Sequence, residues 1–193
     1  FDPSEGYKSL TIYGNSGVTN NDKWKTIVSE IEKVLIEEGI TSISDNMFKN
    51  HTTMKTISIP SSAIQIGNYI LRGCTSLTSI SIATGNSGYS SDSNGVMYNK
   101  DKTTLVQYPL GKSDKEYSIP TNVQTIKTYA FENAQQLENI EIKNETKTVQ
   151  ESAFESISTL RTVTIGTTVE TIEKYAFRFC NNLESFTVEA NNK

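Results

Sequence analysis

Apolar residues recur along this chain every 23 residues, in several parallel columns. One column carries the bulky side chains of Phe48, Leu71, Phe131, Phe154 and Phe177. A second column begins five residues earlier and contains Ile43, Ile66, Ile126, Val149 and Ile172. A third begins six residues later and contains Met54, Leu77, Leu137, Leu160 and Leu183. A fixed period of this length indicates one structural unit stacked on copies of itself, because a single unit cannot bury its apolar face alone.

Within the unit, Met54–Ile59 alternates apolar and polar residues, which is typical of a short strand with one buried face. Equivalent strands are predicted at Leu77–Ile82, Leu137–Ile142, Leu160–Ile165 and Leu183–Val188. Ile31–Ile36 falls in the same columns and is interpreted as an earlier strand. Residues 24–38 also fit an amphipathic helix, but three matching columns favour the strand.

One step in the columns is 60 residues long, between Leu71 and Phe131. Counting back from Ile142 places another strand at Tyr117–Ile119, so that residues 83–119 form one long repeat. The long repeat contains Asn94-Gly95 between residues that favour strands, which is a strong signal of a β-hairpin. We expect seven rungs, each being one turn of the stacked chain, and a hairpin that projects from them.

The predicted fold is therefore a solenoid with one parallel β-sheet of about seven rungs. Short helical turns or irregular backbone are expected on the opposite side. Residues 1–30 are predicted to form an N-terminal capping segment, with a possible edge strand at Leu10–Ile12, and residues 31–193 the solenoid. Residues 189–193 resemble the start of the long repeat, so we expect a truncation at this end, with the stack continuing beyond Lys193.

The net charge of −4 and the scattered Lys and Arg residues argue against nucleic acid or an anionic membrane as the partner. No apolar run approaches the length of about 18 residues that spans a membrane, so no membrane insertion is expected. The chain begins at Phe1 without a recognisable leader. Its localisation is therefore not indicated by a targeting segment.

Catalytic and metal chemistry have little support in the sequence. Cys74 and Cys180 share a column four rungs apart, which is about 19 Å and too far for a disulfide bond. His51, the only histidine, lies in the same column and is expected to be structural. One His and two distant Cys do not make a zinc site, so no metal and no cofactor are expected. We expect the protein not to be an enzyme.

A calcium loop is a weaker alternative for residues 90–101. Ser90, Asp92, Asn94 and Gly95, with Asp101 in the twelfth position, loosely follow the spacing of an EF-hand loop. Ser replaces the first acidic ligand, and Asp101 is too short for the usual bidentate Glu. Since flanking helices are also missing from the pattern, a hairpin turn is the preferred interpretation.

The outward positions of the predicted strands form a mostly uncharged row of hydroxyl and amide side chains. This surface, named the hydroxyl face, consists of Thr56, Ser58, Ser79, Ser81, Ser118, Asn139, Glu141, Thr162, Thr164, Ser185 and Thr187. Solenoids often bind partners on such a face. Thr and Ser also simply suit a solvated strand, which remains the alternative. Lys55 and Arg161 are nearby charges that a partner could use.

The hairpin is the second candidate binding element. It carries Tyr98 and Tyr108, and tyrosine combines apolar area with a hydroxyl group that suits protein and sugar contacts. Tyr89 belongs to the same segment, but it lies 23 residues after Ile66 and could belong to the core. A structural role for the hairpin tyrosines is therefore the alternative.

Two phrases in the chain resemble the BspA-like leucine-rich-repeat surface proteins. One is Val169-x-x-Ile-x-x-Tyr-Ala-Phe-x-x-Cys-x-x-Leu183, and the other runs from Gly95-Val-Met-Tyr to Leu105-Val-x-Tyr-Pro109. The resemblance covers roughly residues 31–193. The first two rungs depart from it, because Met47-Phe48 and Ile70-Leu71 stand in place of Ala-Phe.

This resemblance implies a leucine-rich-repeat solenoid from a secreted or cell-surface protein. Members of the family are described as adhesins that bind host matrix proteins or neighbouring cells, and the family has no catalytic motif. We therefore expect a non-enzymatic extracellular recognition module that binds a protein or a glycan. The alternative is a spacer repeat of a larger surface protein, with no ligand of its own.

Overall fold

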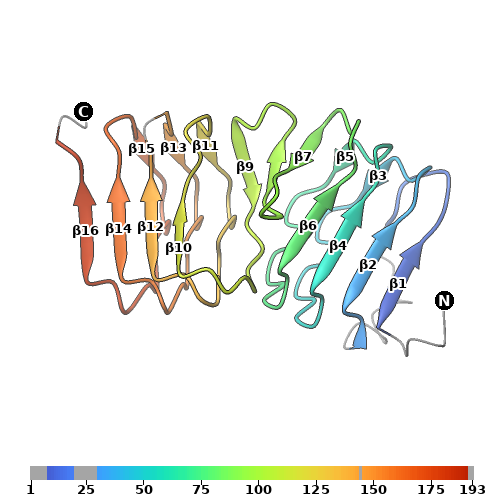
Figure 1. Ribbon diagram of the computed structural model, residues 1–193, viewed down its shortest axis with the longest axis horizontal. Helices are drawn as coiled ribbons and strands as arrows, with labels where there is room; N and C mark the ends of the chain where they lie inside the picture. Colours follow the sequence, from blue (N-terminus) through green and yellow to red (C-terminus); the bar gives the residue numbers. More distant parts are fainter. Residues whose placement is uncertain (1–7, 20–29, 144, 191–193) are drawn as a thin grey trace.

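The computed structural model describes residues 8–19, 30–143 and 145–190, and these residues wind into a parallel β-solenoid (Figure 1). Each rung contributes one strand to the main layer. The strands of this layer are β1 (Ser9–Ile12), β2 (Lys33–Ile36), β4 (Thr56–Ile59), β6 (Ser79–Ile82), β10 (Glu116–Ser118), β12 (Asn139–Ile142), β14 (Thr162–Ile165) and β16 (Ser185–Val188). The seven predicted rungs are confirmed. The possible edge strand is present as β1, which pairs in parallel with β2.

The 23-residue period sets the register of the main layer. Thr56 pairs with Ser79, and Asn139 pairs with Thr162, each exactly one period apart in the sequence. In β4 and β14 every second side chain is buried, because a strand turns successive side chains to opposite faces. The alternation in the sequence therefore predicted both the strands and their inward faces.

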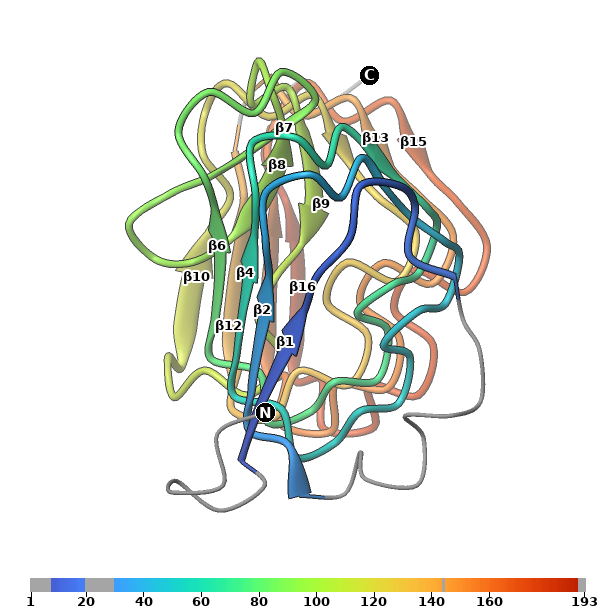
Figure 2. The same cartoon turned by 90° about the vertical axis from the view of Figure 1, so that its right-hand side faces the viewer.

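A second layer of short strands runs along the opposite side of the rungs (Figure 2). Its strands are β3 (Ser42–Ile43), β5 (Gln65–Ile66), β7 (Tyr89–Ser91), β8 (Met97–Asn99), β9 (Thr104–Gln107), β11 (Thr125–Ile126), β13 (Thr148–Val149) and β15 (Thr171–Ile172). The prediction of helical turns or irregular backbone on this side was incomplete. Across residues 8–19, 30–143 and 145–190 no α-helix is present.

The hairpin interrupts both layers. In the main layer β1, β2, β4 and β6 form one sheet, and β10, β12, β14 and β16 form another. The turn between β7 and β8 lies against the open edge of β6, where Ile80 N–H donates to the carbonyl of Gly95 at 3.0 Å. Gly95 has φ +73°, and a Cβ there would lie 2.9 Å from Ser79 Cα. Only glycine allows this close approach.

The hairpin does not project as predicted, because it is folded into the second layer. β7 and β8 are antiparallel, β8 pairs with β9, and β9 joins β11 in a parallel pair. As a result, the core is divided at β8. Met97 packs with the N-terminal apolar cluster, whereas Val96 and Tyr98 pack with the C-terminal cluster. Adjacent residues of one strand thus face two different cores.

Each regular rung turns through two residues with left-handed backbone, four positions apart. The first column contains Asn46, Tyr69, Tyr129, Ser152 and Tyr175, with φ between 57° and 63°. The second contains Asn50, Gly73, Asn133, Ser156 and Phe179. Asn and Gly tolerate this conformation, whereas a bulky residue pays about 1–2 kcal/mol for it. The aromatic residues in these columns are therefore not required by the turn itself.

Candidate binding surfaces

The hydroxyl face is exposed or partly exposed at all eleven predicted positions. Its inward neighbours are buried on β4, β12 and β14, whereas Phe186 and Val188 on β16 are 43% and 51% exposed. The prediction of one continuous row across the rungs was wrong, because the main layer consists of two separate sheets. Thr56, Ser58, Ser79 and Ser81 lie in the N-terminal sheet, and the other seven lie in the C-terminal sheet. The hairpin turn occupies the space between β6 and β10, so the face is divided into two panels.

Neighbouring side chains in the C-terminal panel are hydrogen bonded to one another. Thr162 Oγ1 donates to Asn139 Oδ1 at 2.6 Å, and Ser118 Oγ donates to Glu141 Oε2. Asn139 Nδ2 in turn donates to Glu116 Oε1 at 3.1 Å. These bonds between rungs hold the polar groups in fixed positions. A partner would therefore meet an ordered array rather than freely rotating side chains.

Lys55 and Arg161 do not stand free beside this face. Lys55 pairs with Glu32 at 2.7 Å, and Arg161 pairs with Glu184 at 2.5 Å. A matching pair joins Lys115 to Glu138 at 2.7 Å. These pairs lie in one row at the start of the main strands. Opposite charges alternate along this row within each half, and the uncharged Thr78 separates the two runs. Hydrogen bonds from Lys55 and Lys115 lower the pKa of Glu32 and Glu138, respectively.

The proposed hairpin site is corrected by the burial of its tyrosines. Tyr98 and Tyr108 are each 1% exposed, so neither ring offers surface to a partner. Tyr108 stacks on Phe131 with a centroid separation of 4.9 Å. Because the hairpin joins the second layer, its apolar side chains close the core instead of facing solvent. The structural alternative is therefore the correct one for these two residues.

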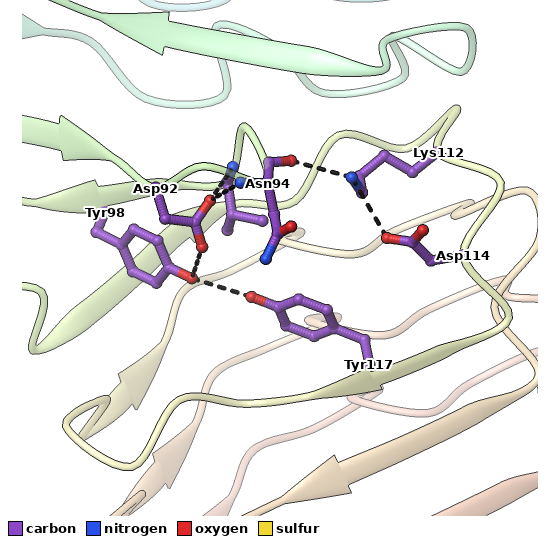
Figure 3. Close-up of polar contacts among 7 residues, drawn as sticks. Asp92, Asn94, Tyr98, Lys112, Asp114 and Tyr117 are labelled. Carbon is purple, nitrogen blue, oxygen red and sulfur yellow. Dashed lines mark hydrogen bonds and ion pairs between the residues drawn. The ribbon is translucent and has the colours of Figure 1, made fainter.

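Tyr98 belongs to a polar cluster that fastens the hairpin turn to β10 (Figure 3). Its hydroxyl group donates to Asp92 Oδ2 at 3.0 Å and lies 2.9 Å from the hydroxyl of Tyr117. Burial raises the pKa of Tyr117 to about 12, so both hydroxyls stay protonated at neutral pH. Lys112 lies on the other side of the turn, between the carbonyl of Asn94 and the carboxylate of Asp114.

The same geometry explains the residues that resemble a calcium loop. Asp92 Oδ1 accepts hydrogen bonds from the backbone N–H groups of Asn94 and Val96, at 2.9 and 3.0 Å. The carboxylate is thus used in building the turn, in an Asx arrangement typical of aspartate at such positions. Within the described part of the chain, no group of three or more His, Cys, Asp or Glu side chains could hold a metal ion.

The residues considered for catalysis are all in the core. His51 is 1% exposed, and burial lowers its pKa, which keeps the imidazole neutral at physiological pH. Cys74 and Cys180 are buried free thiols. Each Sγ donates to the carbonyl of a column Phe one rung earlier, Phe48 or Phe154, at 3.1 Å. Burial raises the pKa of Cys74 to about 12, so this thiol is not nucleophilic.

Two polar features of the structure were not predicted from the sequence. The first is a ladder of threonines along the second layer, where Thr104, Thr125, Thr148 and Thr171 pair in sequence order. The ladder can be recognised in the sequence, because a threonine directly precedes the Ile, Val or Leu of each of these short strands. It was missed because strands were not expected on that side.

The second feature is a contact that joins the two halves behind the hairpin. Arg72 forms a bidentate ion pair with Glu132, with both N–O distances at 2.6 Å. The Arg72 guanidinium also covers the ring of Tyr129 at 3.5 Å, and Tyr69 meets the same ring edge-on. Arg72 and Glu132 occupy the same column, 60 residues apart, so the column arithmetic could have identified the pair.

The fold and these surfaces define a leucine-rich-repeat solenoid with exposed polar strand faces. The chain matches the family described as "BspA type Leucine rich repeat region" in six copies, over residues 21–109 and 111–193. It belongs to this family. No curated protein matches the chain. In the described residues, no helix is long and apolar enough to cross a membrane.

Solved structures show the same fold. A leucine-rich repeat protein from Eubacterium ventriosum is 22% identical with a TM-score of 0.71, and the match covers 95% of this chain and 68% of that one. A leucine rich cell surface protein from Faecalibacterium prausnitzii is 19% identical, TM-score 0.62, covering 95% and 60%. The pneumococcal vaccine antigen PcpA is 18% identical, TM-score 0.61, covering 95% and 62%. This chain spans about two thirds of the length of these proteins.

Proposed function

We propose that this chain is a non-enzymatic recognition module of a bacterial surface protein, which binds a protein or a glycan through the hydroxyl face. The observation that carries the proposal is the C-terminal panel of that face. Its hydroxyl, amide and carboxylate groups project from the sheet and are held by hydrogen bonds between rungs. A dense array of fixed donors and acceptors suits partners that are recognised by many hydrogen bonds.

The alternating charges beside the panel support the same function. Each Lys or Arg of that row is paired with a Glu from a neighbouring rung, so the charges largely cancel. Recognition at this face would then depend on hydrogen bonding and shape rather than on a long-range field. The family match, together with the likeness in fold to a leucine rich cell surface protein, supports a location outside the cell.

The test begins with the purified chain applied to a glycan array and to a panel of immobilised extracellular matrix proteins. Partners found in this way are then measured by biolayer interferometry with the variant Thr164→Arg. Thr164 pairs with Glu141 on β12, so the new guanidinium has a carboxylate neighbour and the fold should be retained. The bulky side chain would still cover the centre of the panel, and we expect binding to weaken at least about tenfold, the loss of one central contact of about 1.4 kcal/mol.

The matched control is Thr148→Arg, which places the same side chain on β13 of the second layer. Binding should be unchanged by this control. Equal binding by both variants would move the site away from the panel. If neither array yields a partner, the chain is better explained as a spacer that holds other parts of a surface protein apart.

A further inference from the structure

The hairpin turn between β7 and β8 contains the only Asn-Gly pair in the sequence, Asn94-Gly95. An asparagine side chain in this context is prone to attack by the backbone nitrogen of the next residue, because glycine has no side chain to shield that nitrogen. Asn94 is exposed, and its side-chain amide makes no hydrogen bond to the residues that the structure describes (Figure 3). The amide group is therefore free to turn toward the Gly95 nitrogen.

A second asparagine of the same repeat shows the opposite arrangement. Asn86 is buried, and its Nδ2 donates to the carbonyls of Pro60 and Ala63, both at 2.9 Å. Its Oδ1 accepts hydrogen bonds from two backbone N–H groups of the turn that follows. These bonds hold the side chain away from the nitrogen of the next residue. Asn86 is therefore an internal reference for Asn94 in the same molecule.

A cation contacts the peptide bond that would react. Lys112 Nζ donates to the carbonyl oxygen of Asn94 at 3.1 Å, and its side chain is only 16% exposed. Removal of the Gly95 amide proton places negative charge on the nitrogen and, by resonance, on this carbonyl oxygen. The nearby carboxylates have other partners, because Asp92 Oδ1 accepts from two backbone N–H groups and Asp114 pairs with Lys112 at 3.3 Å.

We propose that Asn94-Gly95 is a self-modification site that requires no enzyme. The Gly95 N–H is released from the carbonyl of Asp92, at 3.1 Å, and gives its proton to hydroxide. The nitrogen then forms a bond to Asn94 Cγ, and the Cγ–Nδ2 bond breaks as ammonia leaves with a proton from water. Water opens the cyclic imide at either carbonyl, which gives aspartate or isoaspartate at position 94. Lys112 stabilises the anion from which the attack begins.

Isoaspartate at this position loosens the hairpin turn where it covers β6, because it adds one methylene group to the main chain between positions 94 and 95. Gly95 is buried, and its carbonyl accepts from Ile80 N–H at 3.0 Å. An added Cβ on Gly95 would already lie 2.9 Å from Ser79 Cα, so the packing leaves little room for a longer main chain. The turn therefore moves away from β6, and Ile80 N–H loses its partner. Aspartate keeps the normal main chain and fits the turn.

The reaction is measured by intact mass spectrometry and peptide mapping of the purified chain in a mildly alkaline buffer. We expect loss of ammonia and then uptake of water at Asn94, and no reaction at Asn86. Lys112→Met removes the charge but keeps an unbranched side chain, and should slow the native reaction about fivefold, the factor expected for one partly exposed charge. In concentrated urea, where the turn is unfolded, the variant and the parent protein should react at the same rate.

The matched control for the loss of the ion pair is Asp114→Asn. This variant removes the partner of Lys112 but keeps the ammonium group at the Asn94 carbonyl, so the native reaction should not be slowed. Slowing equal to that of Lys112→Met would assign the effect to the ion pair and overturn the role given to the ammonium group.

The structural consequence is measured on the isoaspartate form after its separation by ion exchange and its identification with protein isoaspartyl methyltransferase. Native-state hydrogen exchange of the Ile80 amide should be faster in this form than in the parent protein. The Ile140 amide, on β12 in the other sheet, should be unchanged. Asn94→Asp is the matched control, because it supplies the same charge with a normal main chain and should leave Ile80 protected.

Three further results would overturn the proposal. One is native deamidation of the Lys112→Met protein at the rate of the parent protein, and another is equal reaction at Asn86 and Asn94. The third is an isoaspartate form in which the Ile80 amide is as well protected as in the Asn94→Asp protein, since the modification would then leave the turn in place.

Discussion

The two halves of the solenoid share the 23-residue period but place different types of side chain in the core. In the N-terminal half (β1 to β6) the column of bulky residues contains Phe48 and Leu71, packed among aliphatic and methionine side chains. In the C-terminal half (β9 to β16) the rings of Tyr108, Phe131, Phe154 and Phe177 form a continuous stack, with centroid separations of 4.7 to 5.0 Å. The 23-residue period therefore specifies where a core residue lies, whereas the size and shape of its side chain differ between the halves.

The largest expected effect comes from breaking the aromatic stack. Phe154→Ala removes a fully buried ring with a neighbour on each face, and should cost about 3–5 kcal/mol of unfolding free energy. Leu71→Ala is the matched change in the N-terminal half, expected at about 2–5 kcal/mol. Urea denaturation followed by circular dichroism measures both. Equal losses would mean that stacking adds nothing beyond the buried area.

The next effect concerns the contact between the halves. Arg72→Ala leaves the Glu132 carboxylate, whose side chain is 9% exposed, without its cation, and should destabilise the protein by about 3 kcal/mol. Because the buried residues form two separate clusters, we expect calorimetry of this variant to show two separate unfolding transitions. Arg178→Ala, in the same column, is the control. Its pair with Glu155 is longer, at 3.9 Å, and more exposed, so the loss should be below about 1 kcal/mol.

A smaller effect is expected in the N-terminal half, where the free energy of unfolding should depend on pH through His51. Burial lowers the pKa of His51, so the unfolded chain binds a proton more readily than the folded one. Stability should therefore fall as the pH drops below about 6.5, with a slope of at most about 1.4 kcal/mol per pH unit. His51→Cys, which copies Cys74 and Cys180, should remove this dependence between pH 6.5 and 5. If the slope of stability against pH is unchanged in this variant, the pH dependence arises from another titrating group.

The smallest effect concerns the alternating charges, which both halves share. Glu32 lies between Lys8 and Lys55, and Glu138 pairs with Lys115, with Arg161 also lowering its pKa. Since these pKa values are lowered, their stabilisation is present above the ordinary glutamate pKa of about 4.5 and is lost as the pH falls below it.

We expect Glu32→Gln and Glu138→Gln to lower the melting temperature slightly and equally at low salt. High salt should remove the difference from the parent protein, because exposed charges are screened. If the decrease in melting temperature persists at 1 M salt, packing rather than charge explains the contribution of these residues to stability.

Most of the solenoid could be predicted from the sequence, because most of its main strands alternate apolar and polar residues over four or more positions. Met54–Ile59 carries enough alternation to specify both the strand and its inward face. The two-residue strands of the second layer were not predicted, because a strand such as β3 or β13 contains only one apolar residue, and two residues carry no recognisable period. Their register follows from stacking alone.

The sites were less predictable for a related reason. The exposure of Thr162 and Ser185 follows from strand alternation, but the division of the hydroxyl face does not, since it depends on where the inserted residues return to the stack. A projecting hairpin and one folded into the second layer have the same turn signal at Asn94-Gly95. Only the tertiary packing that buries Tyr98 and Tyr108 distinguishes them.

The division of the core at β8 also determines how the molecule would respond to tension. Each rung contacts only its neighbours, so a force applied at the two ends would peel the chain away one rung at a time. At β8 the peeling would stop, because Met97 and Tyr98 pack into two different cores and the Arg72–Glu132 pair joins the two halves. Under load, the hairpin would thus serve as a mechanical stop, with one half extended and the other still folded.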